Sequence, residues 1–270
     1  MSTLVREPAV AGQFYPGKRE TLLRDIARFT EEPREKIRAI GCVVPHAGYM
    51  YSGHVAGAVY AKLQLPPRYI ILCPNHTGMG EPLAIMSEGR WATPLGEVGI
   101  DSELASSLKS AMPLVHEDTV AHRSEHALEV QLPFLQKLVP DFTFVPLTVG
   151  TGNFEALSAL GVSIAKVIAA AGESVMVIAS SDMNHYESDE ITRVKDAIAI
   201  ERVLALDPRG LYDAVKREHI SMCGYGPTVA MLTAARRLGA SSAELIRYAT
   251  SGDVSGERNA VVGYAGIVVK

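Results

Sequence analysis

The sequence predicts a single α/β domain built on a mainly parallel β-sheet. Short apolar runs rich in β-branched residues alternate with longer segments of helical periodicity, which is the pattern of βαβ units. The length of 270 residues and the hydrophobic content of 47% support a sizeable core. Because no Ser/Gly-rich linker, repeat or low-complexity run divides the chain, we expect one domain over residues 1–270.

Six apolar runs are the predicted strands. The first four are "AIGCVV" (39–44), "YIILC" (69–73), "FTFVPLTV" (142–149) and "VMVIA" (175–179), and two more close the chain at 244–249 and 261–269. Residues 83–98, after the second run, are predicted to form a hairpin. Helical periodicity predicts helices over 53–64, 101–111, 126–138, 153–171, 189–206, 209–218 and 227–238. Asp101 and Asp207 are suitable N-caps, and Pro227 suits a first helical turn.

The composition argues against several classes of partner. A formal net charge of −4, with no Lys/Arg cluster longer than a pair, gives no electrostatic footprint for nucleic acid. No segment approaches the roughly 18 uninterrupted apolar residues of a membrane span, and no secretory h-region is present. The three cysteines are far apart, which argues against a disulfide framework or a zinc knuckle. We therefore expect a soluble protein of the reducing cytoplasm, with neither nucleic acid nor membrane as partner.

Histidines follow three of the strongest predicted strands. His46 lies in "PHAGY" after the first strand, His76 in "CPNH" after the second, and Asp182 and His185 in "SSDMNHY" after the run 175–179. Because the carboxyl ends of parallel strands share one edge of a sheet, where ligands bind, we expect these side chains to converge. Neutral imidazole is the commonest ligand of transition metals. One such histidine could equally cap a loop or lie in a core, but three at strand ends favour a shared metal site.

Two further segments carry candidate residues. In "HRSEHALE" (122–129) the residue order does not match H-E-x-x-H, so His126 is either a second-sphere or acid/base group or part of a solvated helix start. In "MCGYGP" (222–227), Cys223 precedes a predicted helix, whose positive end would lower the pKa of the thiol and favour the thiolate. The alternative is a buried cysteine that acts as a small hydrophobe.

Glycines in "PHAGYMYSGH" predict a tight loop after the first strand. Gly48 and Gly53 would let Tyr49 and Tyr51 line the crevice at the sheet edge. His54 is expected one turn into the next helix, as a structural residue.

Six motifs occur in one order: "REPAVAGQFYPG", "PHAGYMYSG", "CPNH", "EHALEVQLPFL", "SSDMNHY" and "CGYGP". Together they strongly resemble the Memo family, named for a mediator of ErbB2-driven cell motility, and the resemblance extends over nearly the whole chain, from Arg6 to about Gly266. Prokaryotic members are known as system protein B of the AmmeMemoRadiSam set. The resemblance implies a fold similar to the class III extradiol dioxygenases, or LigB-like: a three-layer α/β/α domain with a central mixed, mostly parallel sheet.

The resemblance also implies a metal site. The class III dioxygenases hold Fe(II) with two histidines and a glutamate. His46 and His76 match the two histidines, and Cys223 stands where those enzymes carry the glutamate. Because a thiolate is softer than a carboxylate, this ligand set is compatible with Fe(II), our first expectation, and also with Cu or Zn.

Further roles follow from the same resemblance. His126 and His185 match second-sphere histidines that serve as acid or base in the dioxygenases. Asp182 is assigned to the same catalytic group, either as an oxygen ligand or as a residue that orients a histidine. The expected substrate contacts are Tyr49, Tyr51 and Asn75.

We expect from these features a metal-dependent redox protein, related to the extradiol dioxygenases, that acts on a small aromatic or enol substrate. An alternative is non-catalytic binding of a phosphopeptide or partner protein in the same pocket, although the sequence lacks the Arg cluster typical of phosphate recognition. A third hypothesis is a role beside radical-SAM and AMMECR-type companion proteins, and a fourth is a zinc hydrolase. Assembly into a homo-oligomer is expected from the resemblance.

Overall fold

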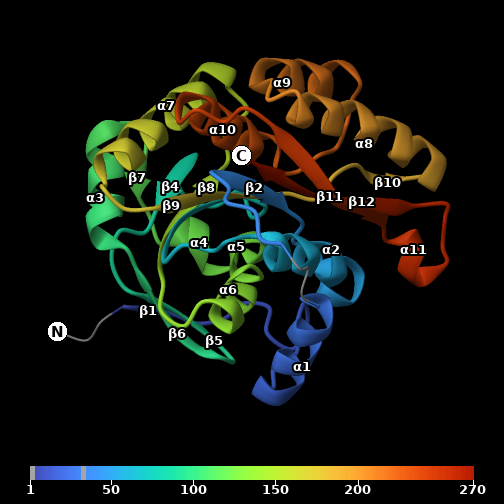
Figure 1. Ribbon diagram of the computed structural model, residues 1–270, viewed down its shortest axis with the longest axis horizontal. Helices are drawn as coiled ribbons and strands as arrows, with labels where there is room; N and C mark the ends of the chain where they lie inside the picture. Colours follow the sequence, from blue (N-terminus) through green and yellow to red (C-terminus); the bar gives the residue numbers. More distant parts are fainter. Residues whose placement is uncertain (1–3, 32–34) are drawn as a thin grey trace.

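A twelve-stranded mixed sheet runs through the computed structural model, which describes residues 4–31 and 35–270 (Figure 1). The strands are β1 (Val5–Arg6), β2 (Gly41–Val44), β3 (Arg68–Pro74), β4 (Leu83–Ile85), β5 (Arg90–Thr93), β6 (Gly96–Ile100), β7 (His116–Glu117), β8 (Thr143–Val149), β9 (Val175–Ser180), β10 (His185–Glu187), β11 (Ala243–Thr250) and β12 (Val261–Val269). Their order along the main path is β1-β5-β6-β8-β3-β9-β2-β12-β10. Off this path, β11 pairs with β12, and β4 pairs with β7 and β8.

Four parallel strands at the centre, β8, β3, β9 and β2, position the candidate functional residues. Val44 of β2 pairs with Ser180 of β9, and Leu72 of β3 pairs with Ala179 of β9. These strands are buried along almost their whole length, as expected for parallel strands that helices cover on both faces. Their carboxyl ends meet at one edge of the sheet, so the loops that follow Val44, Pro74 and Ser180 are neighbours.

Helices form a layer on each face of the sheet (Figure 1). One layer contains α3 (Ser102–Ala111), α7 (Phe154–Ala170), α8 (Asp189–Leu204), α9 (Pro208–Arg217) and α10 (Tyr225–Arg237). The other contains α1 (Arg19–Phe29), α2 (Tyr49–Lys62), α5 (His126–Glu129) and α6 (Leu132–Leu138). Two four-residue helices, α4 (Val120–Arg123) and α11 (Gly252–Ser255), complete the described elements. Within the described ranges, no helix is long and apolar enough to cross a membrane.

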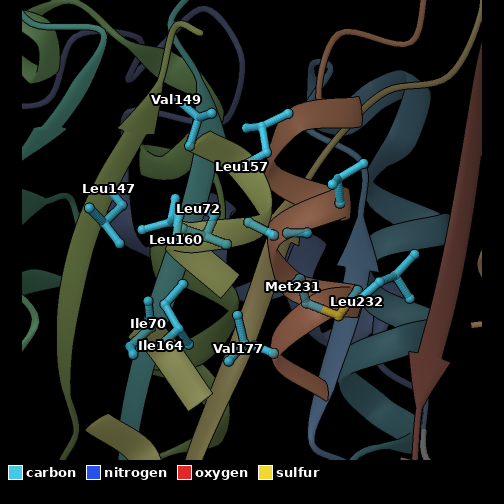
Figure 2. Packing of buried hydrophobic residues seen from close by; sticks show 14 of the residues in the cluster. Ile70, Leu72, Leu147, Val149, Leu157, Leu160, Ile164, Val177, Met231 and Leu232 are labelled. Carbon is cyan, nitrogen blue, oxygen red and sulfur yellow. The ribbon is translucent and has the colours of Figure 1, made fainter. Parts of the chain in front are cut away.

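The core on the α7/α10 side holds the central strands in place. Leu160 and Ile164 of α7 and Met231 of α10 pack with Ile70 of β3 and Val177 of β9 (Figure 2). All of these side chains are buried, and burial of an apolar side chain of this size contributes about 1.5–3 kcal/mol. The packing fixes the position of the strands whose ends carry the candidate site.

The predicted fold class is confirmed, because helices cover both faces of one mixed, mostly parallel sheet. All six predicted strands are present, with ends that differ by at most two residues from the prediction. The predicted hairpin is narrower than expected. Residues 90–100 form the antiparallel pair β5 and β6, whereas Leu83–Ile85 pairs with β8 instead.

Two predicted helices differ in a way that matters for the site. The helix predicted over 126–138 is interrupted at 130–131, and a second helix, α6, begins at Leu132 with Pro133 in its first turn. The helix predicted over 53–64 begins earlier, at Tyr49, with Gly48 as its extended N-cap. Helix α1 was not predicted from the sequence, although its buried residues Leu22 and Ile26 have helical spacing.

Replacement of Gly161 by alanine tests the contact between α7 and α10. A Cβ at position 161 would lie 2.4 Å from the carbonyl oxygen of Ala230, and backbone cannot move aside as a flexible side chain can. We expect Gly161→Ala to lower the free energy of unfolding by about 1–3 kcal/mol, measured by urea denaturation. The matched control is Gly99→Ala, whose added Cβ would meet only the end of the Arg90 side chain, at 3.8 Å. Equal stability of the two variants would contradict the close approach of the helices.

Candidate metal centre

Three potential ligands converge at the carboxyl edge of the sheet. His46 follows β2, His76 follows β3, and Cys223 directly precedes the segment that begins α10. One nitrogen or sulfur atom of each lies within 4.8 Å of those of the other two. The Sγ atom of Cys223 is 3.2 Å from Nε2 of His46, and the rings of His46 and His76 are 5.1 Å apart between centroids. The spacing of these atoms is suited to a single metal ion.

Hydrogen bonds beneath His46 fix which of its ring nitrogens carries the proton. Nδ1 of His46 lies 3.0 Å from Oγ of Ser180, and that hydroxyl donates its only proton to the carbonyl of Ala127 at 2.6 Å. Ser180 therefore accepts from Nδ1–H of His46. Gln131 also donates to Oγ of Ser180, at 2.9 Å. Since burial lowers the pKa of His46 well below its ordinary value, the ring is neutral and Nε2 keeps a free lone pair.

Glu125 orients the second histidine. Its fully buried carboxylate accepts from the backbone N–H of His76 at 2.6 Å and faces Nδ1 of the same ring at 2.9 Å. Burial alone would raise the pKa of Glu125, but the hydrogen bonds from His76 and from the N–H of Ala127 hold it below its usual range. The ionised carboxylate keeps the proton of His76 on Nδ1, so Nε2 is left to bind a metal.

A second cluster of possible ligands contains His76, Glu125 and His126. The oxygens of Glu125 already accept three hydrogen bonds, two from His76 and one from the N–H of Ala127. A metal there would have to displace these bonds. The cluster of His46, His76 and Cys223 is therefore the better candidate, with Glu125 as its orienting residue.

The thiol of Cys223 differs from what the sequence suggested. The start of α10 was expected to lower the pKa of this group, but burial, reinforced by the nearby Asp182, raises it well above its ordinary value. Because Nε2 of His46 has no proton, the thiol donates to it across the 3.2 Å contact. A divalent ion at the same place would displace this proton and bind the thiolate. Two imidazole nitrogens and one thiolate fit iron, copper or zinc.

Two further histidines face the same space. His126 begins α5, and its ring stacks on that of His76 with 4.7 Å between centroids. Nδ1 of His185 lies 2.9 Å from the carbonyl oxygen of Ser221. Because a carbonyl oxygen can only accept a hydrogen bond, Nδ1 carries the proton, and Nε2 is a proton acceptor. Burial lowers the pKa of both rings, which keeps them neutral near pH 7.

Asp182 lies under the loop that carries His46. Its carboxylate accepts from the backbone N–H of His46 at 2.7 Å, and its carbonyl oxygen lies 3.6 Å from Sγ of Cys223. Burial raises the pKa of Asp182 to about 7, while its hydrogen bonds act in the opposite direction. The group can therefore gain or lose a proton near neutral pH.

A cavity of about 590 Å³ opens beside these residues. Its lining consists of Phe14, His46, Ala47, Gly48, His76, His126, Asp182, His185, Tyr186, Ser221, Cys223 and Val262. None of these described lining residues is a lysine or arginine. A smaller cavity of about 220 Å³ also reaches His76 and Cys223, and Asn75 lines it.

The expected substrate contacts lie in different places. Tyr49 is only 4% exposed and donates to the carbonyl of Val130 at 2.7 Å, because α2 begins at this residue and directs its ring into the core. Tyr51 packs beside Val55 and lines neither cavity. Asn75 borders the smaller cavity, but its side chain closes the following turn through the carbonyl of Met79.

Several residues of the site had no role assigned to them from the sequence, although Glu125 belongs to the charged cluster noted at 122–129. Phe14 and Tyr186 line the larger cavity, and Ser180 and Glu125 hold the two imidazole rings. Their positions within "REPAVAGQFYPG", "SSDMNHY" and "HRSEHALE" were visible, but nothing in the residue types distinguishes them from ordinary structural neighbours.

Comparisons with known proteins agree over almost the whole chain. A family described as "Memo-like protein" matches residues 6–268. A "MEMO1 family protein" of Methanosarcina mazei is 46% identical over 269 residues, 98% of this chain and 99% of the relative. Another, from Pyrobaculum aerophilum, is 43% identical, with 98% of each chain covered.

The fold is shared with other proteins of known structure, and one of these is a crystal structure. It is that of an uncharacterized protein from Escherichia coli K12, which is similar with a TM-score of 0.53 and 15% identity, covering 84% of this chain and 98% of the other. Because the sequence identity is only 15%, the similarity shows a shared fold and says nothing of a shared function.

The Glu125→Gln substitution tests the orienting role of this carboxylate. A neutral amide of the same shape is a weaker acceptor for Nδ1–H of His76, so we expect zinc affinity to fall about 10- to 100-fold. The measurement is zinc titration against a competing chelator. Glu88→Gln, an exposed position, is the control and should bind zinc as the unmodified protein does. Unchanged affinity in Glu125→Gln would contradict the assignment.

The raised pKa of Cys223 predicts how metal affinity depends on pH. The thiol is protonated near neutral pH, and binding must release that proton, so affinity should rise about tenfold per pH unit between roughly pH 7.5 and 8.5. His46 adds no proton in this range, because its pKa is lowered. Zinc titrations at several pH values measure the slope, with Cys42→Ala, a buried core cysteine, as control. A flat profile would exclude Cys223 as a thiolate ligand.

Proposed function

The chain belongs to the Memo family, and we propose that it uses a transition metal bound by His46, His76 and Cys223 for redox chemistry on a small substrate. One observation carries the proposal: ligand atoms of these residues lie within 4.8 Å of one another. Hydrogen bonds from the rings support it, because they leave both Nε2 atoms free to bind a metal.

The metal we propose first is Fe(II), with Cu as an alternative for the same chemistry and Zn as a redox-inert one. Two imidazoles are compatible with all three, and the thiolate favours the softer ions. When bound, iron or copper would supply one-electron chemistry and a Lewis-acid centre that orients the reactants. A reducing compartment such as the cytoplasm would keep the thiol of Cys223 available as a ligand.

Residues around the proposed metal would handle protons. Nε2 of His185 is a proton acceptor because Nδ1 donates to the carbonyl of Ser221. His126, neutral and stacked on His76, would serve as a second acid or base. Asp182, with a pKa of about 7, would exchange a proton near neutral pH while it holds the loop of His46. Phe14 and Val262 would keep the apolar part of the cavity dry.

The phosphopeptide alternative has less support in the cavity. Phosphate recognition normally uses arginine or lysine side chains, and none is present among the described lining residues. The neutral histidines supply no permanent positive charge. We therefore favour a small substrate over a phosphopeptide.

Metal analysis of protein purified without oxygen tests the proposal. We expect one iron or copper ion per chain after loading, and affinity at least about 100-fold lower in His46→Ala and Cys223→Ala. His116→Ala, an exposed histidine outside the site, should bind metal normally. Oxygen uptake with catechol-type substrates then tests for redox chemistry. Absence of metal binding together with tight phosphopeptide binding would overturn the proposal.

The Cys223→Glu variant tests how much the thiolate determines which metal binds. It supplies a carboxylate at the third ligand position, as in the dioxygenases that the family resembles. We expect it to shift metal preference from copper toward Fe(II), measured by competitive loading with both ions. An unchanged preference would mean that the sulfur does not bind the metal.

A further inference from the structure

Tyr186 has an unusual backbone conformation. Among the described residues, three non-glycine residues have positive φ: Tyr186 (61°), Leu206 (53°) and His219 (49°). Such values are costly for a residue with a Cβ atom and require a structural reason.

Leu206 and His219 have an ordinary reason, because each follows the end of a helix. The residue after Leu206, Asp207, donates its N–H to the carbonyl of Arg202. The residue after His219, Ile220, likewise donates its N–H to the carbonyl of Val215. These bonds are the Schellman arrangement, in which the residue after the C-cap is left-handed. Tyr186 lies in β10 and ends no helix, so this explanation does not apply to it.

A bulge in β10 imposes the conformation of Tyr186. His185 pairs with Val262 of β12, and Glu187 pairs with Val261. Val261 and Val262 are consecutive, whereas one residue separates His185 from Glu187, so β10 has one residue more than β12 at this point. The extra residue is Tyr186. Bulges of this kind redirect a side chain and are frequent beside active sites.

Hydrogen bonds fix the chain on both sides of the bulge. Before it, the N–H of His185 donates to Oγ of Ser221 at 2.7 Å, and Ser221 in turn donates to Oδ1 of the buried Asn184 at 3.0 Å. After it, the carboxylate of Glu187 accepts from Nδ2 of Asn184 at 2.7 Å and from Lys195 at 2.6 Å. The surroundings thus hold Tyr186 in a conformation that it would not adopt by itself.

The strain is not offset by packing of the tyrosine ring. Tyr186 is 78% exposed, so its ring adds little to the core. It nevertheless lines the larger cavity, 5.6 Å from the ring of His185 between centroids. Phe14 contributes a second aromatic wall and packs against His126 at 4.6 Å. The strained backbone of Tyr186 is thus kept at a cavity although it does not stabilise the fold, which points to a role of this residue in ligand binding.

We propose that Tyr186 contacts the substrate and selects ligands with a flat, uncharged ring, together with Phe14. The proposal rests on the proposed function in taking this cavity as the substrate site. Aromatic rings favour a planar partner over a saturated one of the same size. Since no described residue of the lining is a lysine or arginine, the side chains of the cavity offer no ion pair to an anionic group.

A matched pair of probes tests the selectivity: 2-naphthol, which is planar, and decahydro-2-naphthol, its saturated counterpart. Titrations use the full chain, both zinc-loaded and metal-free. We expect tighter binding of 2-naphthol, and Tyr186→Gly should lower its affinity about 3- to 10-fold while affinity for the saturated probe changes less than twofold. Tyr186→Phe, which keeps the ring, should bind both probes as the unmodified protein does.

Thermal unfolding provides the second readout. Glycine adopts positive φ without strain, so Tyr186→Gly should have an unchanged Tm or one raised by up to about 4 °C. His219→Gly is the matched control, because it relieves the same strain at an exposed helix end outside the cavity, and it should leave both affinities unchanged. An unchanged or raised Tm together with a loss of selectivity, at Tyr186 and not at His219, is the result that supports the proposal.

Two results would overturn the inference. In one, Tyr186→Gly binds 2-naphthol as the unmodified protein does; in the other, it loses both probes equally, which would indicate a change in cavity shape. Failure of the metal proposal gives a different result. Zinc would then not bind, while the metal-free protein would still prefer 2-naphthol through Tyr186.

Discussion

The parallel pairing of β2, β9 and β3 is the constraint on which the candidate metal centre depends. Val44 pairs with Ser180, and Leu72 with Ala179, so the loops after these strands leave the sheet together. This brings His46, His76 and Asp182 to one edge although they are far apart in the sequence. Packing of α7 and α10 against the strands makes this edge rigid, and a rigid support gives a metal site its fixed geometry.

Hydrogen-bond acceptors then decide the protonation of the histidines. Ser180, Glu125 and the carbonyl of Ser221 each face an Nδ1 atom, so three rings from different loops share one tautomer. None of these acceptors needs to touch a metal or substrate. Burial acts in the same direction for His46 and His185, because a low pKa keeps the rings neutral and able to accept a metal or a proton.

The sequence was sufficient for the fold class and for the convergence of His46, His76 and His185, because apolar strands and the residues that follow them are local signals. Cys223 follows no strand and was assigned to the site only through the family resemblance. Predictions from the sequence were wrong or missing for features that tertiary packing determines. Tyr49 looked like a pocket residue, but a helix that starts four residues early turns its ring inward. The expected low pKa of Cys223 followed from the start of α10, and burial, which a sequence does not display, outweighs that effect. The strain at Tyr186 arises from pairing with β12 and likewise has no local signature.

The contact between Cys223 and His46 also bears on the chemical lifetime of the protein. Oxidants and electrophiles attack a thiolate much faster than a thiol. A sulfur that is partly buried and keeps its proton on a hydrogen bond to His46 is therefore less open to irreversible oxidation than a thiolate would be. If the proposed metal binds at this sulfur, newly made chains would in this way remain able to bind it during a shortage of metal, and the hydrogen bond to His46 would act like a protecting group in synthesis.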